Sequence, residues 1–371
     1  MLGHKRIPSR EGGIEVVVEE LSARMAERGH KVTCYNRSGH HVSGKEFDGG
    51  KKQKEYRGIR LKIAPALNVK GIAAATASLS GAFRAAFGRY DVVHFHAEGP
   101  AFVCWLPKIT GKRVVVTIHG LDHRRAKWGR FARSYIMAGE KNAVRFADEI
   151  IVLSREAQRY FRDTYARETT LIPNGAERPE IRPADKIRSL GLEKDGYLLF
   201  VGRLVPEKGI QYLIRAFKGL RTDKKLVIAG GESDAATFAQ QLRAEAEGDD
   251  RILFTGFVQG ALLEELYSSA YLCCLPSDLE GMPLTLLEAM SYGNCCVVSD
   301  IPECTEVTEG QAAAFKQGDV EDLRRKLQQL CDERESVEGY RRGAADLICK
   351  KYGWEDVTER TLELYRGEKS E

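Results

Sequence analysis

The sequence AYLCCLPSDLEGMPLTLLEAMSYGNCCVVSD, residues 270–300, indicates the fold. An apolar run (270–276) is followed by a polar loop, by helical spacing from Pro283 to Gly293, and by a second apolar run (295–300). Short apolar runs that flank one helix are typical of parallel strands joined by a crossover. Proline suits the first turn of a helix and glycine suits its end. This stretch therefore predicts a β-α-β unit of a parallel sheet.

The same alternation continues along the chain and predicts two α/β domains. Strands that alternate with helices form parallel sheets covered on both faces. The strands we expect are 31–37, 58–65, 91–97, 113–120 and 149–154 in the first half, and 197–203, 225–231, 251–257, 270–276 and 295–300 in the second. A chain of 371 residues is also long for a single core. We therefore expect two Rossmann-like domains.

A polar, proline-bearing stretch at 174–196 marks the boundary between the domains. We place the first domain at 1–178 and the second at 179–353, and we expect the terminal helix at 354–371 to cross back to the first domain. A Gly-rich loop normally follows the first strand of such a sheet, but only Met1–His4 precede the loop here. We expect an abbreviated strand or a start upstream, and a weakened first domain if the strand is missing.

Charge is distributed unevenly along the chain. Residues 1–178 contain 32 Lys and Arg against 18 Asp and Glu, so their net charge is +14, whereas the whole chain carries +4. A solvated surface is the better explanation for any single lysine, but for the difference between the two halves we favour a functional cause, such as an anionic acceptor or an anionic membrane surface. Basic residues gather with Trp128 and Phe131 at 123–133, where we expect a cationic amphipathic helix that binds a membrane or an acceptor, or that is simply solvated.

Other features of the composition bear on location and partners. The sequence shows neither a secretory signal nor an apolar run that would span a bilayer, so we expect membrane contact to be peripheral. The nine cysteines contain no C-x-x-C pair and suit a reducing cytoplasm. We therefore expect a cytoplasmic protein, located at the inner face of the plasma membrane if it contacts membrane, and we expect no nucleic-acid partner.

Two stretches of the first half carry candidate ligand-binding residues. Gly12 and Gly13 precede a helix, so their backbone can approach a phosphate, although two glycines also suit a structural turn. His119 ends a strand, where the carboxyl edge of a parallel sheet binds ligands, and we favour a functional role for it. For His94 and His96, which also end a strand, we favour a structural role.

The loop GRLVPEKG, residues 202–209, places two cations between a strand and a helix. Arg203 and Lys208 can neutralise a diphosphate leaving group there. An ordinary surface ion pair, for example between Lys208 and Glu207, explains the same residues equally well.

The segment EGMPLTLLE, residues 280–288, places two glutamates around a break in the chain. Glu288 lies about a turn and a half into the helix and can accept hydrogen bonds from a ribose, whereas Glu280 is placed for a sugar. Ser277 and Glu280 also match a capping box, but the glycine and proline after Glu280 argue against a helix there. We expect an anion site at the start of the helix, formed by the backbone of Gly281, Met282, Pro283 and Leu284.

Together these stretches resemble the family 4 retaining glycosyltransferases, which have the two-domain GT-B fold. The resemblance rests on the Gly-Gly loop, His119-Gly120, PNGAE at 173–177, GRLVPEKG, the glutamate pair and the terminal WEDVTERTLELY. The opening residues and the stretch that runs into KWGRFAR resemble a bacterial subset that builds surface polysaccharides. The chain departs from the family in its short first strand and in Met-Pro at 282–283, where the family often has Phe-Gly.

The resemblance implies parallel sheets that face a central cleft, with the acceptor on the first domain and the donor on the second. Family members use a nucleotide-sugar donor and a glycan or lipid-linked acceptor, retain the anomeric configuration and need no metal or cofactor. The sequence contains no D-x-D metal motif, in agreement. The implied roles place Gly12, Gly13 and Gly202 near the donor, Arg203 and Lys208 on its diphosphate, Glu288 on its ribose, and His119 and Glu280 at the reacting sugar.

Other functions remain open from the sequence. A nucleotide-sugar epimerase of the same architecture would convert donor without an acceptor, and a sugar-nucleotide-binding protein would bind donor without transfer. A dinucleotide dehydrogenase is disfavoured because G-x-G-x-x-G is absent. A phosphorylase would need a lysine that carries pyridoxal phosphate, which the sequence does not identify.

Overall fold

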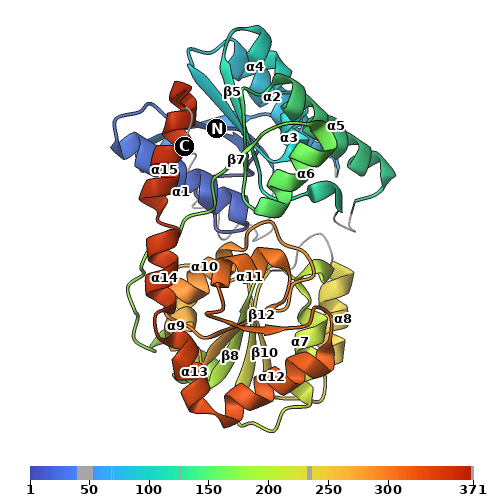
Figure 1. The fold of residues 1–371 in the computed structure, drawn as a ribbon, viewed down its shortest axis with the longest axis vertical. Coiled ribbons are helices and arrows are strands. Elements are labelled where there is room, and N and C mark those ends of the chain that lie inside the picture. Colours follow the sequence, from blue (N-terminus) through green and yellow to red (C-terminus); the bar gives the residue numbers. More distant parts are fainter. Residues whose placement is uncertain (40–52, 68, 70, 125–127, 232–235, 369–371) are drawn as a thin grey trace. The chain divides into compact units, whose positions relative to one another are not determined.

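The computed structural model describes residues 1–39, 53–67, 69, 71–124, 128–231 and 236–368. The chain divides into two compact units, of which the first comprises Met1–Gly175 and Trp354–Glu371 and the second Ala176–Gly353 (Figure 1). The sequence placed the corresponding limits at 178 and 353.

The first unit contains two sheets whose strands run parallel, except for β2 beside β3. Their strand orders are β1-β3-β2 and β4-β5-β6-β7. The bounds are β1 Thr33–Arg37, β2 Glu55–Tyr56, β3 Ile59–Ala64, β4 Val92–His96, β5 Arg113–Ile118, β6 Glu149–Val152 and β7 Thr170–Leu171. The short strands β2 and β7 were not expected from the sequence.

The first residues of the chain lie between these two sheets. Leu2 forms a parallel bridge with Phe95 of β4, and its amide donates a hydrogen bond to the carbonyl of His94 at 2.9 Å. On the other side, the carbonyl of Met1 accepts a hydrogen bond from the amide of Tyr35 in β1 at 3.1 Å. The described residues Met1 and Leu2 thus connect the two sheets at the place where the abbreviated strand was expected, but they form an isolated bridge and not a strand.

Helices pack around the sheet of the first unit (Figure 1). They are α1 Gly13–Glu27, α2 Ala73–Ala86, α3 Glu98–Ala101, α4 Trp105–Ile109, α5 Arg130–Phe146, α6 Arg155–Tyr165 and α15 Trp354–Arg366, with the 3₁₀ helix η2 at Asp122–Arg124. The last helix, α15, packs against α1. Two ion pairs join them, from Arg28 to Glu355 at 2.6 Å and from Arg28 to Glu359 at 2.8 Å.

The expected cationic helix at 123–133 is wrong in its first part. Asp122–Arg124 forms a 3₁₀ helix, and α5 begins only at Arg130. The reason is local, because Gly129 precedes α5 with extended backbone (φ −66°, ψ 169°) and interrupts the helical path. Residues 125–127 of the predicted helix lie outside the described residues.

The second unit contains one parallel sheet in the order β10-β9-β8-β11-β12-β13. Its strands are β8 Tyr197–Val201, β9 Lys225–Ala229, β10 Ile252–Gly256, β11 Leu272–Leu275, β12 Cys296–Ser299 and β13 Ala313–Phe315, of which the sequence missed β13. Strands β11 and β12 pair in parallel with α10 between them in the chain, which confirms the β-α-β unit predicted from residues 270–300.

Helices cover both faces of this second sheet, with α7, α8 and α12 on one face and α9, α10 and α14 on the other (Figure 1). Their bounds, with those of the remaining helices, are η3 Lys186–Leu190, η4 Pro206–Lys208, α7 Ile210–Lys218, α8 Ala236–Ala246, α9 Ala261–Ser269, α10 Leu284–Ser291, α11 Pro302–Thr308, α12 Val320–Asp332, α13 Arg334–Arg341 and α14 Ala344–Lys351. Apolar side chains that alternate along β8 and β9, such as Leu198, Phe200 and Ile228, are fully buried beneath α7 and α12. Each unit is therefore a Rossmann-like α/β layer structure, as expected.

Candidate functional site

The strand order of the second unit creates a switch point between β8 and β11. The chain runs outward from β8 through β9 to β10, and then returns to the other side of β8 with β11, β12 and β13. The loops that leave β8 and β11 therefore diverge at the carboxyl edge of the sheet, which is where open α/β sheets bind ligands. These two loops carry GRLVPEKG and EGMPLTLLE.

Lys208 and Glu280 form an ion pair across this edge. Lys208 Nζ lies 2.6 Å from Glu280 Oε1, and the two side chains are only 15% and 8% exposed. The hydroxyl of Ser277, a fully buried residue, donates to the same carboxylate oxygen at 2.6 Å. The partner of Lys208 is therefore Glu280, one of the two carboxylates that the sequence singled out.

Gly209 allows the two loops to approach each other. Its φ of +66° lies in the left-handed region, and a Cβ on it would stand 1.8 Å from the carbonyl oxygen of Pro276. Only glycine fits such a contact without displacing the backbone. A further backbone bond joins the loops, from the amide of Asp278 to the carbonyl of Glu207 at 2.9 Å. The pairing of Lys208 with Glu280 thus depends on close backbone contact.

The break after Glu280 separates the loop from α10. Pro283, with extended backbone, is the N-cap of α10, and Gly293 follows the helix with a φ of +79°. Both positions agree with the sequence analysis. Ser277 and Glu280 bond through their side chains rather than as a capping box, because the helix begins only at Leu284. The first turn of a helix leaves its amides without intrahelical partners, which is the property an anion site needs.

Glu288 is half-buried within α10 and has a polar neighbour from α9. The hydroxyl of Tyr267 donates to Glu288 Oε2 at 3.3 Å. Burial first, and then the Glu288 carboxylate, raise the pKa of Tyr267 well above its usual range. The hydroxyl therefore stays protonated and remains a donor that orients Glu288. Sequence reasoning missed Tyr267, because a tyrosine within a helix gives no signal of its own.

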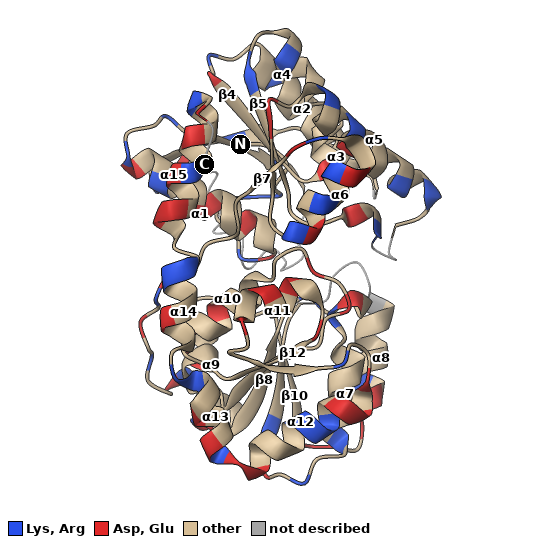
Figure 2. Ribbon diagram, in the orientation of Figure 1, with Lys and Arg blue, Asp and Glu red and all other residues tan. Residues whose placement is uncertain are grey.

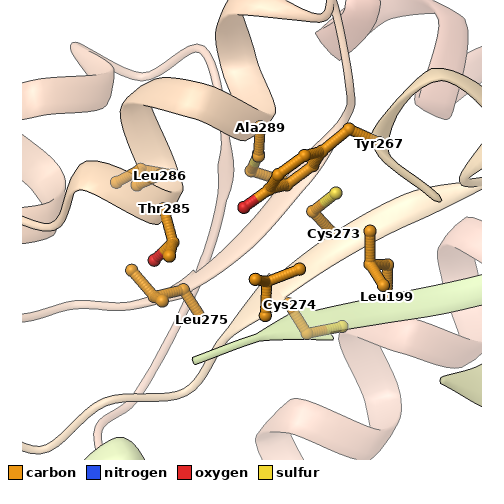
Figure 3. A pocket seen from close by; sticks show the side chains of 10 residues that line it. Leu199, Tyr267, Cys273, Cys274, Leu275, Thr285, Leu286 and Ala289 are labelled. Atoms are coloured by element: carbon orange, nitrogen blue, oxygen red, sulfur yellow. The ribbon is translucent and has the colours of Figure 1, made fainter. Parts of the chain in front are cut away.

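A small cavity lies beneath α10. Figure 3 shows Thr285, Leu286 and Ala289 of α10 above it and Cys273, Cys274 and other residues of the sheet below. Its volume of about 10 Å³ admits no more than about one water molecule. Among the described residues, the buried hydroxyl of Thr285 has no hydrogen-bond partner. The cavity is too small to hold a nucleotide.

Arg203 and Gly202 follow β8 on the same loop as Lys208. Arg203 is half-buried, and none of the described side chains forms an ion pair with it. Gly230, which follows β9, approaches Gly202 so closely that a Cβ on Gly230 would lie 1.9 Å from the Gly202 carbonyl oxygen. The contact with Gly230 therefore fixes the backbone at Gly202. The Arg203 guanidinium makes no ion pair among the described residues and is available to a ligand.

The first unit holds the remaining predicted residues. His119 follows β5, and its Nε2 lies 3.0 Å from Nδ1 of the fully buried His96. Burial, together with His94 and His119, holds the pKa of His96 well below its usual range, so His96 is neutral. His94 Nε2 lies 2.7 Å from the hydroxyl of Thr117, and this buried hydrogen bond agrees with the structural role that we favour for His94. A hydrogen bond to a neighbouring ring also agrees with the structural role we favour for His96, and the functional role of His119 stays a prediction.

Gly12 and Gly13 lie at the start of α1. A Cβ on Gly12 would stand 2.5 Å from Glu15 Oε2, and Glu15 Oε1 accepts a hydrogen bond from the amide of Lys5 at 2.8 Å. Gly12 thus makes room for a buried carboxylate, which is a structural reason for a glycine. Gly13 is exposed. Their part in donor binding stays a prediction.

Basic residues occur on both units, interspersed with acidic ones (Figure 2). At the start of α5, Arg130 and Arg133 are exposed and flank Phe131, whose side chain is 84% exposed. Within the described residues, no helix combines the length and the apolar character needed to cross a membrane. Contact with an anionic membrane stays a prediction.

Two family models match this chain and together cover most of it. One, described as Glycosyltransferase Family 4, matches residues 11–178, and the other, Glycosyl transferases group 1, matches residues 183–346. The second match contains both loops of the switch point.

Individual proteins are similar to the chain over different lengths. An uncharacterized glycosyltransferase of Methanocaldococcus jannaschii is 32% identical over 190 residues, which cover 48% of this chain and 47% of that protein. The chain therefore matches less than half the length of that relative. A D-inositol 3-phosphate glycosyltransferase of Acidothermus cellulolyticus is 27% identical over 96% of this chain and 85% of its own. The structure of HepE from Anabaena, solved with UDP and glucose, superimposes with a TM-score of 0.81 at 15% identity and covers 98% of both chains.

Proposed function

Because the chain belongs to the group 1, family 4 glycosyltransferases, which have the GT-B fold, we propose that it transfers a sugar from a nucleotide-sugar donor to a glycan or lipid-linked acceptor. The observation that carries the proposal is the cluster of Lys208, Glu280 and Ser277 at the switch point of a parallel sheet. We propose further that transfer retains the anomeric configuration, needs no metal, and serves the synthesis of a bacterial surface polysaccharide at the cytoplasmic side of the membrane.

The donor would bind to the second unit through groups of different charge. Lys208, Arg203 and the first turn of α10 supply positive charge and free amides for the diphosphate. Glu288, held by Tyr267, would accept hydrogen bonds from the two ribose hydroxyls. Glu280 would contact the sugar. The diphosphate would share Lys208 with Glu280, since the ammonium group has three donor hydrogens.

The chemistry would consist of leaving-group stabilisation more than of covalent catalysis. Lys208 and Arg203 would stabilise the charge that develops on the departing diphosphate. The acceptor hydroxyl would attack from the face that the diphosphate leaves, which retains the configuration. Glu280 already accepts hydrogen bonds from Lys208 and Ser277, which favours a positioning role over that of a nucleophile. His119 would lie by the reacting centre, held by His96.

A panel of sugar nucleotides tests the proposal. UDP-, GDP- and dTDP-sugars would be screened for a rise in melting temperature, beginning with UDP-glucose, because HepE binds UDP and glucose. Each donor that binds would then be incubated with and without glycan and lipid-linked acceptors. We expect acceptor-dependent release of the nucleotide diphosphate. Conversion of the donor sugar without any acceptor would instead indicate an epimerase, and binding without turnover would indicate a non-catalytic binding protein.

A further inference from the structure

Three side chains from separate segments of the first unit converge in its interior. Glu98 begins α3, His123 lies in η2 and Glu140 lies in α5. The nearest oxygens of Glu98 and Glu140, together with a ring nitrogen of His123, all lie within 4.8 Å of one another. The side chains of Glu98 and Glu140 are 1% and 0% exposed and that of His123 is 14% exposed, so among the described residues His123 is the member of the cluster that faces solvent.

Close helix packing brings the two carboxylates together. Gly139 of α5 approaches α3 so tightly that a Cβ on it would lie 2.0 Å from the backbone oxygen of Glu98. The next residue, Glu140, therefore enters the space beside Glu98. Any side chain at position 139 would push α5 away from α3 and separate the carboxylates.

Neighbouring groups fix the orientation of both carboxylates. The hydroxyls of Tyr160 and Tyr165 donate to Glu140 Oε1 at 2.8 and 2.5 Å. The amide of Asp122 donates to both oxygens of Glu98, at 3.2 and 3.1 Å. Outer hydrogen bonds of this kind are typical of the carboxylate ligands of metal ions, because they hold the ligand atom in place.

Two of the three atoms that face one another at the centre lack hydrogen bonds. Glu140 Oε2 and His123 Nδ1 are both buried and make no hydrogen bond among the described residues, although they lie only 3.2 Å apart. Four ligands around a tetrahedral Zn²⁺, each at about 2.0 Å, would stand about 3.3 Å from one another. The second distance, 4.0 Å from His123 Nδ1 to Glu98 Oε1, would shorten by a shift of the His123 side chain, because the amide of Asp122 holds the Glu98 carboxylate.

The charge of the cluster also calls for a cation. Two carboxylates are buried side by side, and among the described residues no lysine or arginine forms an ion pair with either. His123 lies 4.0 Å from Glu98 Oε1 and 3.2 Å from Glu140 Oε2, and even when protonated it offsets only one of the two negative charges. The nearby Arg124 pairs instead with Glu156 at 2.5 Å. An ion at the centre would remove this conflict.

We propose that Glu98, His123 and Glu140 bind one divalent transition-metal ion, with Zn²⁺ as the best fit to two carboxylates and one imidazole, and with water as the fourth ligand. Imidazole favours zinc and similar ions over Mg²⁺ and Ca²⁺, which prefer oxygen ligands alone. The ion has a structural role, because it joins η2 and α5, which follow His119 in the chain, to α3, which precedes it. It is independent of the donor site in the second unit and of whether transfer needs a metal.

Zinc titration of the chelator-treated full-length protein tests the site. Calorimetry with ZnCl₂ alone should show one ion bound per chain. His123→Ala and Glu140→Gln should each weaken binding by about 100-fold or more, since even the loss of an outer partner costs 10- to 100-fold. Tyr160→Phe, which removes one such outer bond, should weaken binding by about 10- to 100-fold. Glu27→Gln and His30→Ala change the same residue types at exposed positions of the same unit and should leave binding unchanged.

A second measurement does not depend on the folding of variants. Co²⁺ added to the wild-type protein should give the strong visible absorption of a four- or five-coordinate ion, saturate at one equivalent and disappear when Zn²⁺ is added. Weak, octahedral-type absorption would overturn the proposal. So would an absence of stoichiometric Zn²⁺ binding, or binding that His123→Ala and Glu140→Gln leave intact.

Discussion

Lys208 Nζ lies 2.6 Å from Glu280 Oε1, although 72 residues separate the two in the sequence. The lysine follows β8 and the glutamate follows β11, and the two strands are neighbours at the switch point of the sheet. A cation and an anion held there at low exposure can act on opposite parts of one ligand, the lysine on a phosphate and the glutamate on a sugar. The pair therefore predicts opposite effects for the loss of each partner.

Glu280→Gln should separate binding from transfer. Without the carboxylate, Lys208 loses its competing anion, so UDP should bind as tightly as before or up to about tenfold tighter, which corresponds to about 1.4 kcal/mol. Transfer from a UDP-sugar should fall by about 100- to 1,000-fold, because the sugar loses its contact. Calorimetry with UDP and an assay of transfer would check both. A loss of UDP affinity would place Glu280 on the nucleotide and not on the sugar.

Gly209→Ala should damage the site through the backbone. The new Cβ would meet the Pro276 carbonyl oxygen at 1.8 Å. Gly248→Ala is a matched control, because Gly248 also has a positive φ, of +84°, but nothing within 4 Å of its Cβ position. In urea unfolding, the free energy of unfolding of the control should be about 1 kcal/mol lower than that of the wild type, because alanine is strained at a positive φ. That of Gly209→Ala should be lower by about another 1–3 kcal/mol, which is the usual cost of overpacking. Equal losses would mean that the contact with Pro276 relaxes freely.

Buried histidines should make the first unit sensitive to acid. Burial, and next the charge of the chain's amino group, lower the pKa of His4 from 6.5 to about 3. Between these two values the unfolded chain binds a proton that the folded chain excludes, so stability falls as the pH falls below about 6.5. His94 and His96 act in the same direction, because burial also lowers their pKa values.

The variant His4→Gln tests the contribution of His4 to this pH dependence, because glutamine takes up no proton in this range. Its free energy of unfolding, measured with urea between pH 6 and pH 4.5, should fall less steeply than that of the wild type. The difference should approach about 1.4 kcal/mol per pH unit, which is one proton. Equal slopes would show that His4 takes up its proton in the folded protein.

The fold followed from the sequence because its signals are local. Alternating apolar runs and helical spacing located ten strands and the break at Pro283, while Gly293 marked the end of α10. The missed strands β2, β7 and β13 contain only two or three residues each, too few to show a pattern. The predicted helix at 123–133 is wrong in its first part because Gly129 interrupts it and because His123 contacts Glu140 instead. The spacing of basic and aromatic residues that suggested the helix gives no sign of either.

The sequence singled out the residues of the candidate site, whose roles stay predictions, but not the contacts between them. Arg203, Lys208, Glu280 and Glu288 stand out because three of them follow apolar strands and Glu288 is a charged residue within the apolar helix after Pro283. The partner of Lys208 depends on how closely two loops approach at Gly209, which no pattern in the sequence encodes. For the same reason, the cluster of Glu98, His123 and Glu140 has no signature, since its three members belong to separate segments.

The most direct test of the account is the binding of UDP to the full chain by calorimetry, with Lys208→Gln beside the wild type. We expect one UDP per chain in the wild type and an affinity about 10- to 100-fold lower in Lys208→Gln, because a charge-assisted bond of about 1.5–3 kcal/mol is lost. Lys351→Gln, which removes a lysine from the exposed pair with Glu309 elsewhere in the same unit, should bind UDP as the wild type does. UDP affinity that Lys208→Gln leaves unchanged would contradict the account, and so would a failure of UDP, GDP and dTDP alike to bind.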